Sequence, residues 1–163
     1  MGKEGNKKTI SVGDNKYTLQ NPGVRWYVKH QDKCRDRYGS TSRKRYIAGL
    51  LDNVVINPLK VDDFDVKTEK EKKVTVNGEE YTVKYVGNKA ILEIEDNSKD
   101  DAGQFSQEVY IDNLMAEFLE EDVTMDDFEK LNNVQDLIEE IENYNRSKEL
   151  KEVVKSIETF LGA

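Results

Sequence analysis

Few side chains in this sequence could carry out nucleophilic or acid–base chemistry. His30 is the only histidine and Cys34 the only cysteine among the 163 residues. A single cysteine cannot form an internal disulfide, and Cys34 has neither a second cysteine nor a second histidine near it. We therefore interpret Cys34 as a buried, inert thiol and His30 as a half-buried helix residue. The sequence predicts no catalytic residue, cofactor or metal ion, and favours a protein that is not an enzyme.

Two pairs of carboxylates recur at the same place in a repeated phrase, Asp62-Asp63-Phe64 and Asp126-Asp127-Phe128. Paired carboxylates can serve as acid and base or bind a metal. At the start of a helix they also cap free backbone N–H groups, and the phenylalanine that follows can anchor the core. We interpret both pairs as caps. The acidic run 95–101 lacks the glycine and the final glutamate of a calcium-binding loop.

A basic stretch with interleaved aromatic residues runs from Arg25 to Arg45. Such residues can neutralise phosphates and stack on bases, but they can equally pair with an acidic surface. Residues 1–68 carry 14 Lys and Arg against eight Asp and Glu, whereas residues 69–163 carry 11 against 25. The candidate partner-binding residues are Arg25, Trp26, Lys29, Lys33, Arg37, Arg43 and Arg45.

The elements that position these residues occur twice. Residues 8–64 align without a gap with residues 72–128 at an offset of 64, and 15 of the 57 aligned positions are identical. Such a fixed period is the signature of a duplicated structural unit. Duplicated small modules are more often assembly or binding parts than catalysts.

Each copy begins with a hairpin pattern, in which apolar residues alternate on both sides of a turn: Gly13-Asp14-Asn15 in the first copy and Asn77-Gly78 in the second. A helix is predicted over 24–37, and from the repeat we predict its sister around 90–94 as a helix, although that segment also alternates like a strand. Gly39 and Gly103 are interpreted as helix stops, each followed by the N-cap of a second helix. The fold class is therefore α+β, with two homologous modules, each a β-hairpin followed by about three helices.

The helical spacing also predicts which side chains lie in the core. We expect exposed side chains at Trp26 and along the basic face. The predicted core residues are Tyr27, Val28, Tyr46 and Leu50, with their sisters Ile91, Leu92, Tyr110 and Leu114.

The two last amphipathic helices resemble each other at an offset of 16, so that Ile141-Glu142 matches Ile157-Glu158. If each module needs one terminal helix, the second module is inserted in the first between residues 65 and 147, at the charged linker 67–73. Simple tandem packing is the alternative. The predicted domains are a first module 1–66, completed by 147–163 if the modules are nested, a second module 72–145, and a C-terminal helix in 146–163.

The segment 17–27 resembles the tail assembly chaperones of long-tailed phages that infect Gram-positive bacteria. So do 34–39, Tyr46-Ile47, 50–55 and Asp62-Asp63-Phe64. The second copy departs from the pattern, with Val86, Ala90 and Ser98 in place of Pro22, Trp26 and Cys34. The resemblance implies a non-enzymatic protein that coats the tape-measure protein of the phage tail before the tube assembles.

Partner and location follow from this resemblance together with composition. The expected partner is a phage tape-measure protein, with self-association as a further option. The alternatives are a nucleic-acid-binding regulator that uses the basic module, disfavoured by the low pI of about 4.9, and an acidic inhibitor that mimics nucleic acid. Because no long apolar run occurs and residues 1–6 lack a signal-peptide core, we expect a cytoplasmic protein without a membrane partner.

Overall fold

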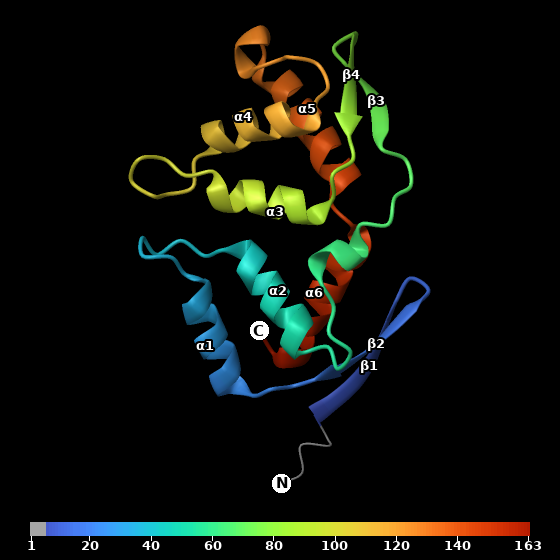
Figure 1. Cartoon of the computed structure of the whole chain (residues 1–163), viewed down its shortest axis with the longest axis vertical. Coiled ribbons are helices and arrows are strands. Elements are labelled where there is room, and N and C mark those ends of the chain that lie inside the picture. The colour runs from blue at the N-terminus through green and yellow to red at the C-terminus, as the bar shows by residue number, and fades with distance from the viewer. Residues whose placement is uncertain (1–5) are drawn as a thin grey trace. The chain divides into compact units, whose positions relative to one another are not determined.

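The computed structural model describes residues 6–163 and divides into two compact units (Figure 1). Unit 1 comprises residues 1–64 together with 148–163, and unit 2 comprises residues 65–147. The N-terminal residues 1–5, on which part of the signal-peptide prediction rests, lie outside the described residues. The predicted α+β class is confirmed, because each unit consists of one antiparallel hairpin and several helices.

The hairpins lie where the alternation predicts them. In unit 1, β1 (Lys7–Val12) pairs with β2 (Asn15–Gln20), so Gly13-Asp14 forms a two-residue turn. In unit 2, β3 (Glu71–Val76) pairs with β4 (Glu79–Lys84) around Asn77-Gly78. Both turn residues of the second hairpin have positive φ, 51° and 79°, as a tight two-residue hairpin turn requires.

Three helices and a short 3-10 segment complete unit 1. They are α1 (Val24–Cys34), α2 (Arg43–Asn53), η2 (Val61–Phe64) and α6 (Lys148–Leu161). Helix α6 packs against β1, α2 and η2. It buries Leu150, Val153, Val154 and Ile157, so the interior of unit 1 is built from two segments far apart in the sequence.

Unit 2 repeats this order with α3 (Asn88–Asn97), α4 (Gln107–Phe118), η3 (Met125–Asp127) and α5 (Leu131–Asn145). The ambiguous segment around 90–94 is thus helical. Helix α5 packs on both strands of its hairpin and on α3 and α4. The core of unit 2 is continuous from Val74 through Leu114 and Phe118 to Ile141.

The two ends of unit 2 meet at Asn88, which is 4% exposed. Asp65 Oδ1 accepts hydrogen bonds from the Asn88 backbone N–H at 2.8 Å and from its side-chain amide at 2.7 Å. The Ser147 N–H donates to Asn88 Oδ1 at 2.7 Å. The chain passes from unit 1 into unit 2 at Asp65 and leaves unit 2 at Ser147. Both of these residues are hydrogen-bonded to the side chain of Asn88.

The charged segment 67–73 is not a free linker, which corrects the sequence interpretation. Strand β3 already begins at Glu71. The Lys67 ammonium donates to the Tyr144 carbonyl at 2.7 Å and lies 4.4 Å from the centre of the Tyr144 ring. Burial and the nearby Lys72 charge lower the pKa of Lys67.

The prediction that Gly39 and Gly103 end helices is wrong, because α1 ends at Cys34 and α3 ends at Asn97. Helix α1 ends at Cys34, and the chain then forms a small loop closed by a β-bridge between Arg35 and Thr41. Asp36 Oδ1 accepts from the N–H groups of residues 38 and 40, and Asp100 does the same in unit 2. The glycines, at φ 85° and 77°, lie in the turns of these loops, where a positive φ favours glycine.

The predicted core is correct except at Val28. Leu50, Ile91, Leu92, Tyr110 and Leu114 are buried, and Tyr27 and Tyr46 are half-buried. Val28 is 50% exposed, and Val24, one turn earlier, is 80% exposed. Helix α1 turns Tyr27, His30 and Cys34 inward instead, so its predicted inward face was placed too far round the helix. Within residues 6–163, none of the helices combines the length and the apolar character needed to cross a bilayer.

Candidate functional site

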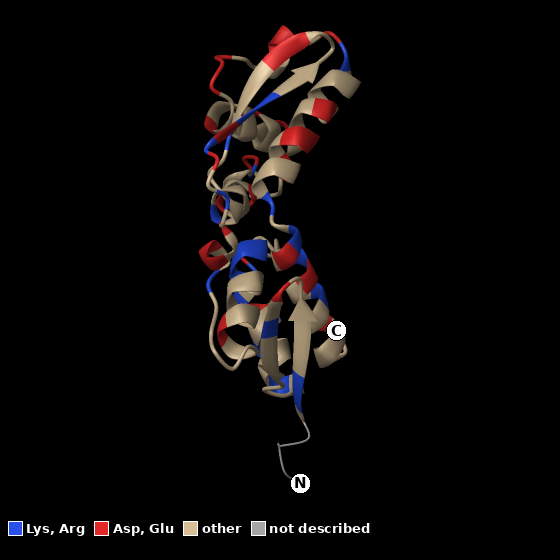
Figure 2. Ribbon diagram, turned by 90° about the vertical axis from the view of Figure 1, so that its right-hand side faces the viewer, with Lys and Arg blue, Asp and Glu red and all other residues tan. Residues whose placement is uncertain are grey.

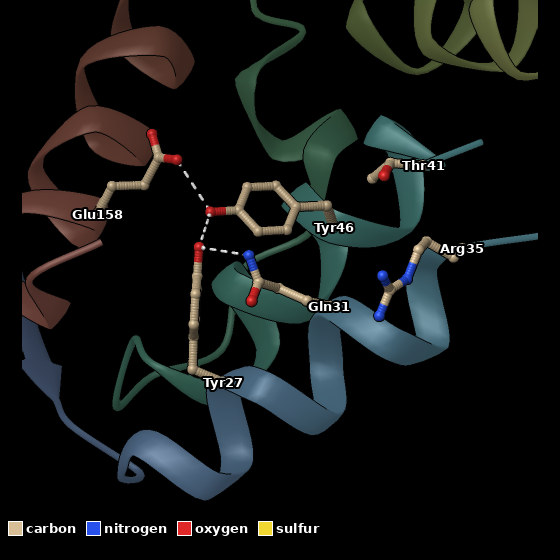
Figure 3. Close-up of a pocket in the computed structure, with 6 residues that line it drawn as sticks. All are labelled: Tyr27, Gln31, Arg35, Thr41, Tyr46 and Glu158. Atoms are coloured by element: carbon tan, nitrogen blue, oxygen red, sulfur yellow. Dashed lines mark hydrogen bonds between the residues drawn. The ribbon is translucent and has the colours of Figure 1, made fainter. Parts of the chain in front are cut away.

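A polar pocket of about 410 Å³ lies within unit 1. Three helices and one loop contribute to it, as Figure 3 shows: α1, α2, α6 and the loop between α1 and α2. Its lining residues are Tyr27, Gln31, Arg35, Thr41, Tyr46 and Glu158. A volume of this size accommodates an amino-acid side chain or a small ligand.

Three side chains in this pocket form a hydrogen-bonded chain. The Tyr46 hydroxyl donates to Glu158 Oε2 at 2.9 Å, so the Tyr27 hydroxyl, 2.8 Å away, is the donor to Tyr46. The Gln31 amide approaches the Tyr27 hydroxyl at 3.5 Å. Burial, followed by the hydrogen bonds with Tyr27 and Glu158, raises the pKa of Tyr46 well above its usual value. The site therefore holds one carboxylate hydrogen-bonded to the neutral Tyr46 hydroxyl.

His30 supports the pocket from behind. Its Nε2–H donates to the Tyr46 carbonyl at 2.9 Å, and its ring stacks on that of Tyr46 at 5.8 Å. A Cβ added at Gly49 would lie 1.9 Å from His30 Cε1, so the glycine makes room for the imidazole. Cys34 is 1% exposed with Sγ 3.7 Å from the imidazole Nε2, which agrees with the predicted buried thiol.

Trp26 is not the exposed ring that the sequence predicted. It is half-buried, and its ring stacks on His30 with centroids 5.0 Å apart and planes at 15°. The reason is its position on α1: His30 lies one turn further along the same face. The indole, the imidazole and the Tyr46 phenol therefore follow one another in a stack.

The structure brings together only part of the predicted basic set. Arg25, Lys29 and Lys33 are exposed and follow each other at intervals of four on α1, so they share one side of that helix. Arg43 and Arg45 are exposed on α2 but two positions apart, and therefore point in different directions. Arg37 donates from Nη2 to the Tyr38 hydroxyl at 2.7 Å.

The second aspartate of each carboxylate pair acts as a cap. Asp63 Oδ2 accepts from the Lys60 N–H at 2.8 Å, and Asp127 Oδ2 accepts from the Thr124 N–H at the same distance. Phe64 is buried and Phe128 packs against the core of unit 2. No group of three or more potential metal-ligating side chains occurs within residues 6–163.

Unit 2 contains a counterpart of the pocket residues, but there an arginine lies among them. Tyr110 and Glu142 correspond to Tyr46 and Glu158, and Glu95 corresponds to Gln31. Arg146 Nη2 donates to Glu95 at 2.6 Å, Glu142 at 3.0 Å and the Tyr110 hydroxyl at 3.1 Å. Although burial opposes its charged form, the hydrogen bond and charge of Glu95 raise the pKa of Arg146.

None of the six pocket residues was among the predicted partner-binding residues, and two of them, Tyr27 and Tyr46, were predicted as core. The sequence did contain a signal for Glu158. Ile157-Glu158 matches Ile141-Glu142, so if each module owns one terminal helix, each module also has one such glutamate. Unit 1 carries 16 Lys and Arg against 10 Asp and Glu, and unit 2 carries nine against 23. Figure 2 shows these charged residues along the ribbon.

Comparison with known proteins returned no matching family model, curated protein or solved structure.

Proposed function

We propose that this protein is a non-enzymatic assembly chaperone that binds a helical segment of an elongated protein partner. The observation that carries the proposal is the outer side of α1. Val24 and Val28 expose 80% and 50% of their surface in a chain with a mean hydropathy of −0.81. Exposed apolar residues on one side of a helix, rimmed by charge, are typical of protein-binding surfaces.

The basic residues of α1 support a partner with acidic side chains. Arg25, Lys29 and Lys33 are exposed beside the two valines, so this helix offers apolar contact and positive charge together. An amphipathic helix with an acidic rim would complement both features. The resemblance of unit 1 to phage tail assembly chaperones supplies the specific candidate, a tape-measure protein of a phage of Gram-positive bacteria.

Co-expression tests this proposal. A candidate tape-measure protein should become soluble and co-purify with the wild-type chain, and Val24→Asp combined with Val28→Asp should abolish both effects. Val66→Asp is the matched control, because Val66 is 73% exposed on unit 2. Failure of the wild type to co-purify or to rescue solubility would reject the chaperone function.

A nucleic-acid-binding role is the second candidate, and the three aligned cations of α1 are the observation that favours it. A complex with DNA or RNA that rests on phosphate neutralisation should weaken steeply between about 50 and 200 mM salt. A gel shift at low salt that disappears in the triple variant Arg25→Gln, Lys29→Gln, Lys33→Gln would support it. The absence of any shift at low salt would dismiss it.

A further inference from the structure

We infer that the pocket of unit 1 receives the guanidinium group of an arginine side chain from a protein partner, in the place that Arg146 takes in unit 2. The two sites are built from corresponding residues of a duplicated chain. In unit 2 the tyrosine–glutamate pair holds the chain's own arginine. In unit 1 the same pair lines an open pocket.

The open pocket follows from one difference between the terminal helices. At the offset of 16 that aligns Glu142 with Glu158, Arg146 aligns with Gly162. Glycine has no side chain, so unit 1 supplies no guanidinium from this position. A second difference widens the entrance: Thr41 stands where unit 2 has Phe105, whose ring lies 5.6 Å from that of Tyr110.

The pocket of unit 1 keeps the main acceptor that a guanidinium needs, a carboxylate beside a tyrosine oxygen. In unit 2 Arg146 donates to two carboxylates and a phenol oxygen. Unit 1 offers the Glu158 carboxylate and, once Tyr27 gives up its hydrogen bond, the Tyr46 oxygen. Gln31 takes the place of Glu95, and its amide oxygen becomes an acceptor for the site when the amide turns over. Figure 3 shows the Glu158 carboxylate and the Tyr46 and Tyr27 hydroxyls converging, with the Gln31 amide nitrogen directed at Tyr27. Among the described residues, Glu158 accepts a side-chain hydrogen bond only from Tyr46, so its carboxylate retains acceptor capacity.

The arginine found in the corresponding site of unit 2 favours arginine over lysine as the occupant. A planar guanidinium can donate to several acceptors at once, whereas an ammonium acts as a point charge. Arg35 lines the pocket as well, but its guanidinium pairs with Asp32 one turn back on α1. Gln31 in place of Glu95 lowers the negative charge of the site, so we expect it to bind a guanidinium less tightly than the site of unit 2 does.

The inference concerns the chemistry of the partner and does not depend on the partner being a tape-measure protein. NMR titration of the full ¹⁵N-labelled chain with the blocked tripeptide acetyl-Gly-Arg-Gly-amide tests it directly. One side chain should bind with a Kd on the order of millimolar. Amide shifts should concentrate at Gln31, Tyr46 and Glu158, and the lysine analogue should bind at least about tenfold more weakly.

Glu158→Gln should weaken arginine-peptide binding about tenfold or more, since it removes the charge that pairs with the guanidinium. Glu152→Gln, an exposed change on the same helix, is the matched control and should bind like the wild type. If Glu158→Gln does not fold, Gln31→Lys, at an exposed position, places a cation in the pocket and should block binding.

Several results would overturn the inference: no localised shifts with the arginine peptide, equal binding of the lysine peptide, or unchanged binding by Glu158→Gln. Preferential binding of acetyl-Gly-Glu-Gly-amide at the same residues would also overturn it, because Arg35 would then be the recognition group. Co-purification with a tape-measure protein despite an inert pocket would reject this inference alone. Peptide binding without co-purification would reject the chaperone proposal alone.

Discussion

The imidazole of His30 occupies the space that a side chain at Gly49 would fill, with Cε1 1.9 Å from the position of a Cβ there. This close approach lets α1 lie against α2, and it aligns His30 with Trp26 and Tyr46. Unit 2 has Ile94 and Asn113 at the corresponding positions. Both residues of this contact therefore differ between the two units.

Gly49→Ala should destabilise unit 1 by roughly 1–3 kcal/mol, the usual cost of overpacking a well-packed contact. Urea unfolding followed by the fluorescence of Trp26, the only tryptophan, measures this change within unit 1. Adding His30→Ala to Gly49→Ala should recover part of the loss, because the small side chain frees the space. An additive double variant would contradict the proposed clash.

Arg146→Met should destabilise unit 2 by roughly 2–3 kcal/mol. The loss comes from leaving Glu95 and Glu142 without their cation, and it is below the value for a fully buried pair because the Arg146 side chain is 30% exposed. Chemical denaturation followed by circular dichroism measures the change. Methylguanidinium at millimolar concentration should raise the melting temperature of Arg146→Ala more than that of Lys148→Ala, the control. Equal shifts would count against a specific guanidinium seat.

Alkaline pH should destabilise unit 1 through Tyr17. Burial, together with the hydrogen bond to Glu149 and its charge, raises the pKa of Tyr17 from 10.0 to about 12. A raised pKa in the folded state means that this contribution to stability is complete below pH 10 and is lost as pH rises through about 12. The difference in unfolding free energy between wild type and Tyr17→Phe should therefore shrink over this range.

Urea titrations at several pH values, with tyrosinate absorbance recorded in parallel, test the Tyr17 prediction. Tyr38→Phe is the comparison variant, since it removes an exposed hydroxyl. A difference between wild type and Tyr17→Phe that stays constant from pH 10.0 to about 12 would show that Tyr17 does not contribute in this way.

Deletion of residues 148–163 should unfold unit 1 while unit 2 keeps its helices. The deletion removes four buried side chains of α6. At about 1.5–3 kcal/mol for each fully buried aliphatic side chain, the loss rivals the whole stability of a small domain. Trp26 emission should shift to the red, with residual helical circular dichroism from unit 2. A shorter deletion of Gly162 and Ala163 is the control, and a native Trp26 spectrum in the long deletion would refute the prediction.

The sequence predicted the hairpins well because their period of two and their turns are local properties. Asn77-Gly78 determines its turn without help from the rest of the chain. The pocket could not be predicted in the same way, since Glu158 is 112 residues from Tyr46 in the sequence. Its place depends on α6 packing in unit 1 rather than beside α5 in tandem.

The sequence prediction was wrong about which side chains of α1 are exposed, because that depends on how the helix is rotated about its axis. Val28 and Trp26 are two positions apart on α1 and lie on opposite sides of it, so the face that α1 turns inward decides which of the two is the more buried. Apolar character alone does not separate a valine from a tryptophan at that boundary. What places Trp26 inward is its stacking on His30, which in turn occupies the space beside Gly49. Both contacts depend on the packing of α1 against α2.

The hydrogen bonds that join Asp65 and Ser147 to Asn88 have a consequence for folding during synthesis on the ribosome. The 83 residues of unit 2 emerge completely before α6 does. Unit 2 can therefore fold while the core of unit 1 still lacks the buried side chains of α6. Once folded, it holds Asp65 and Ser147 at one side chain. The entropy lost when α6 docks is then that of closing a short loop rather than one of 83 residues. Insertion thus allows the later-encoded unit to fold first, and its folding brings together the two chain ends that lead into the earlier unit.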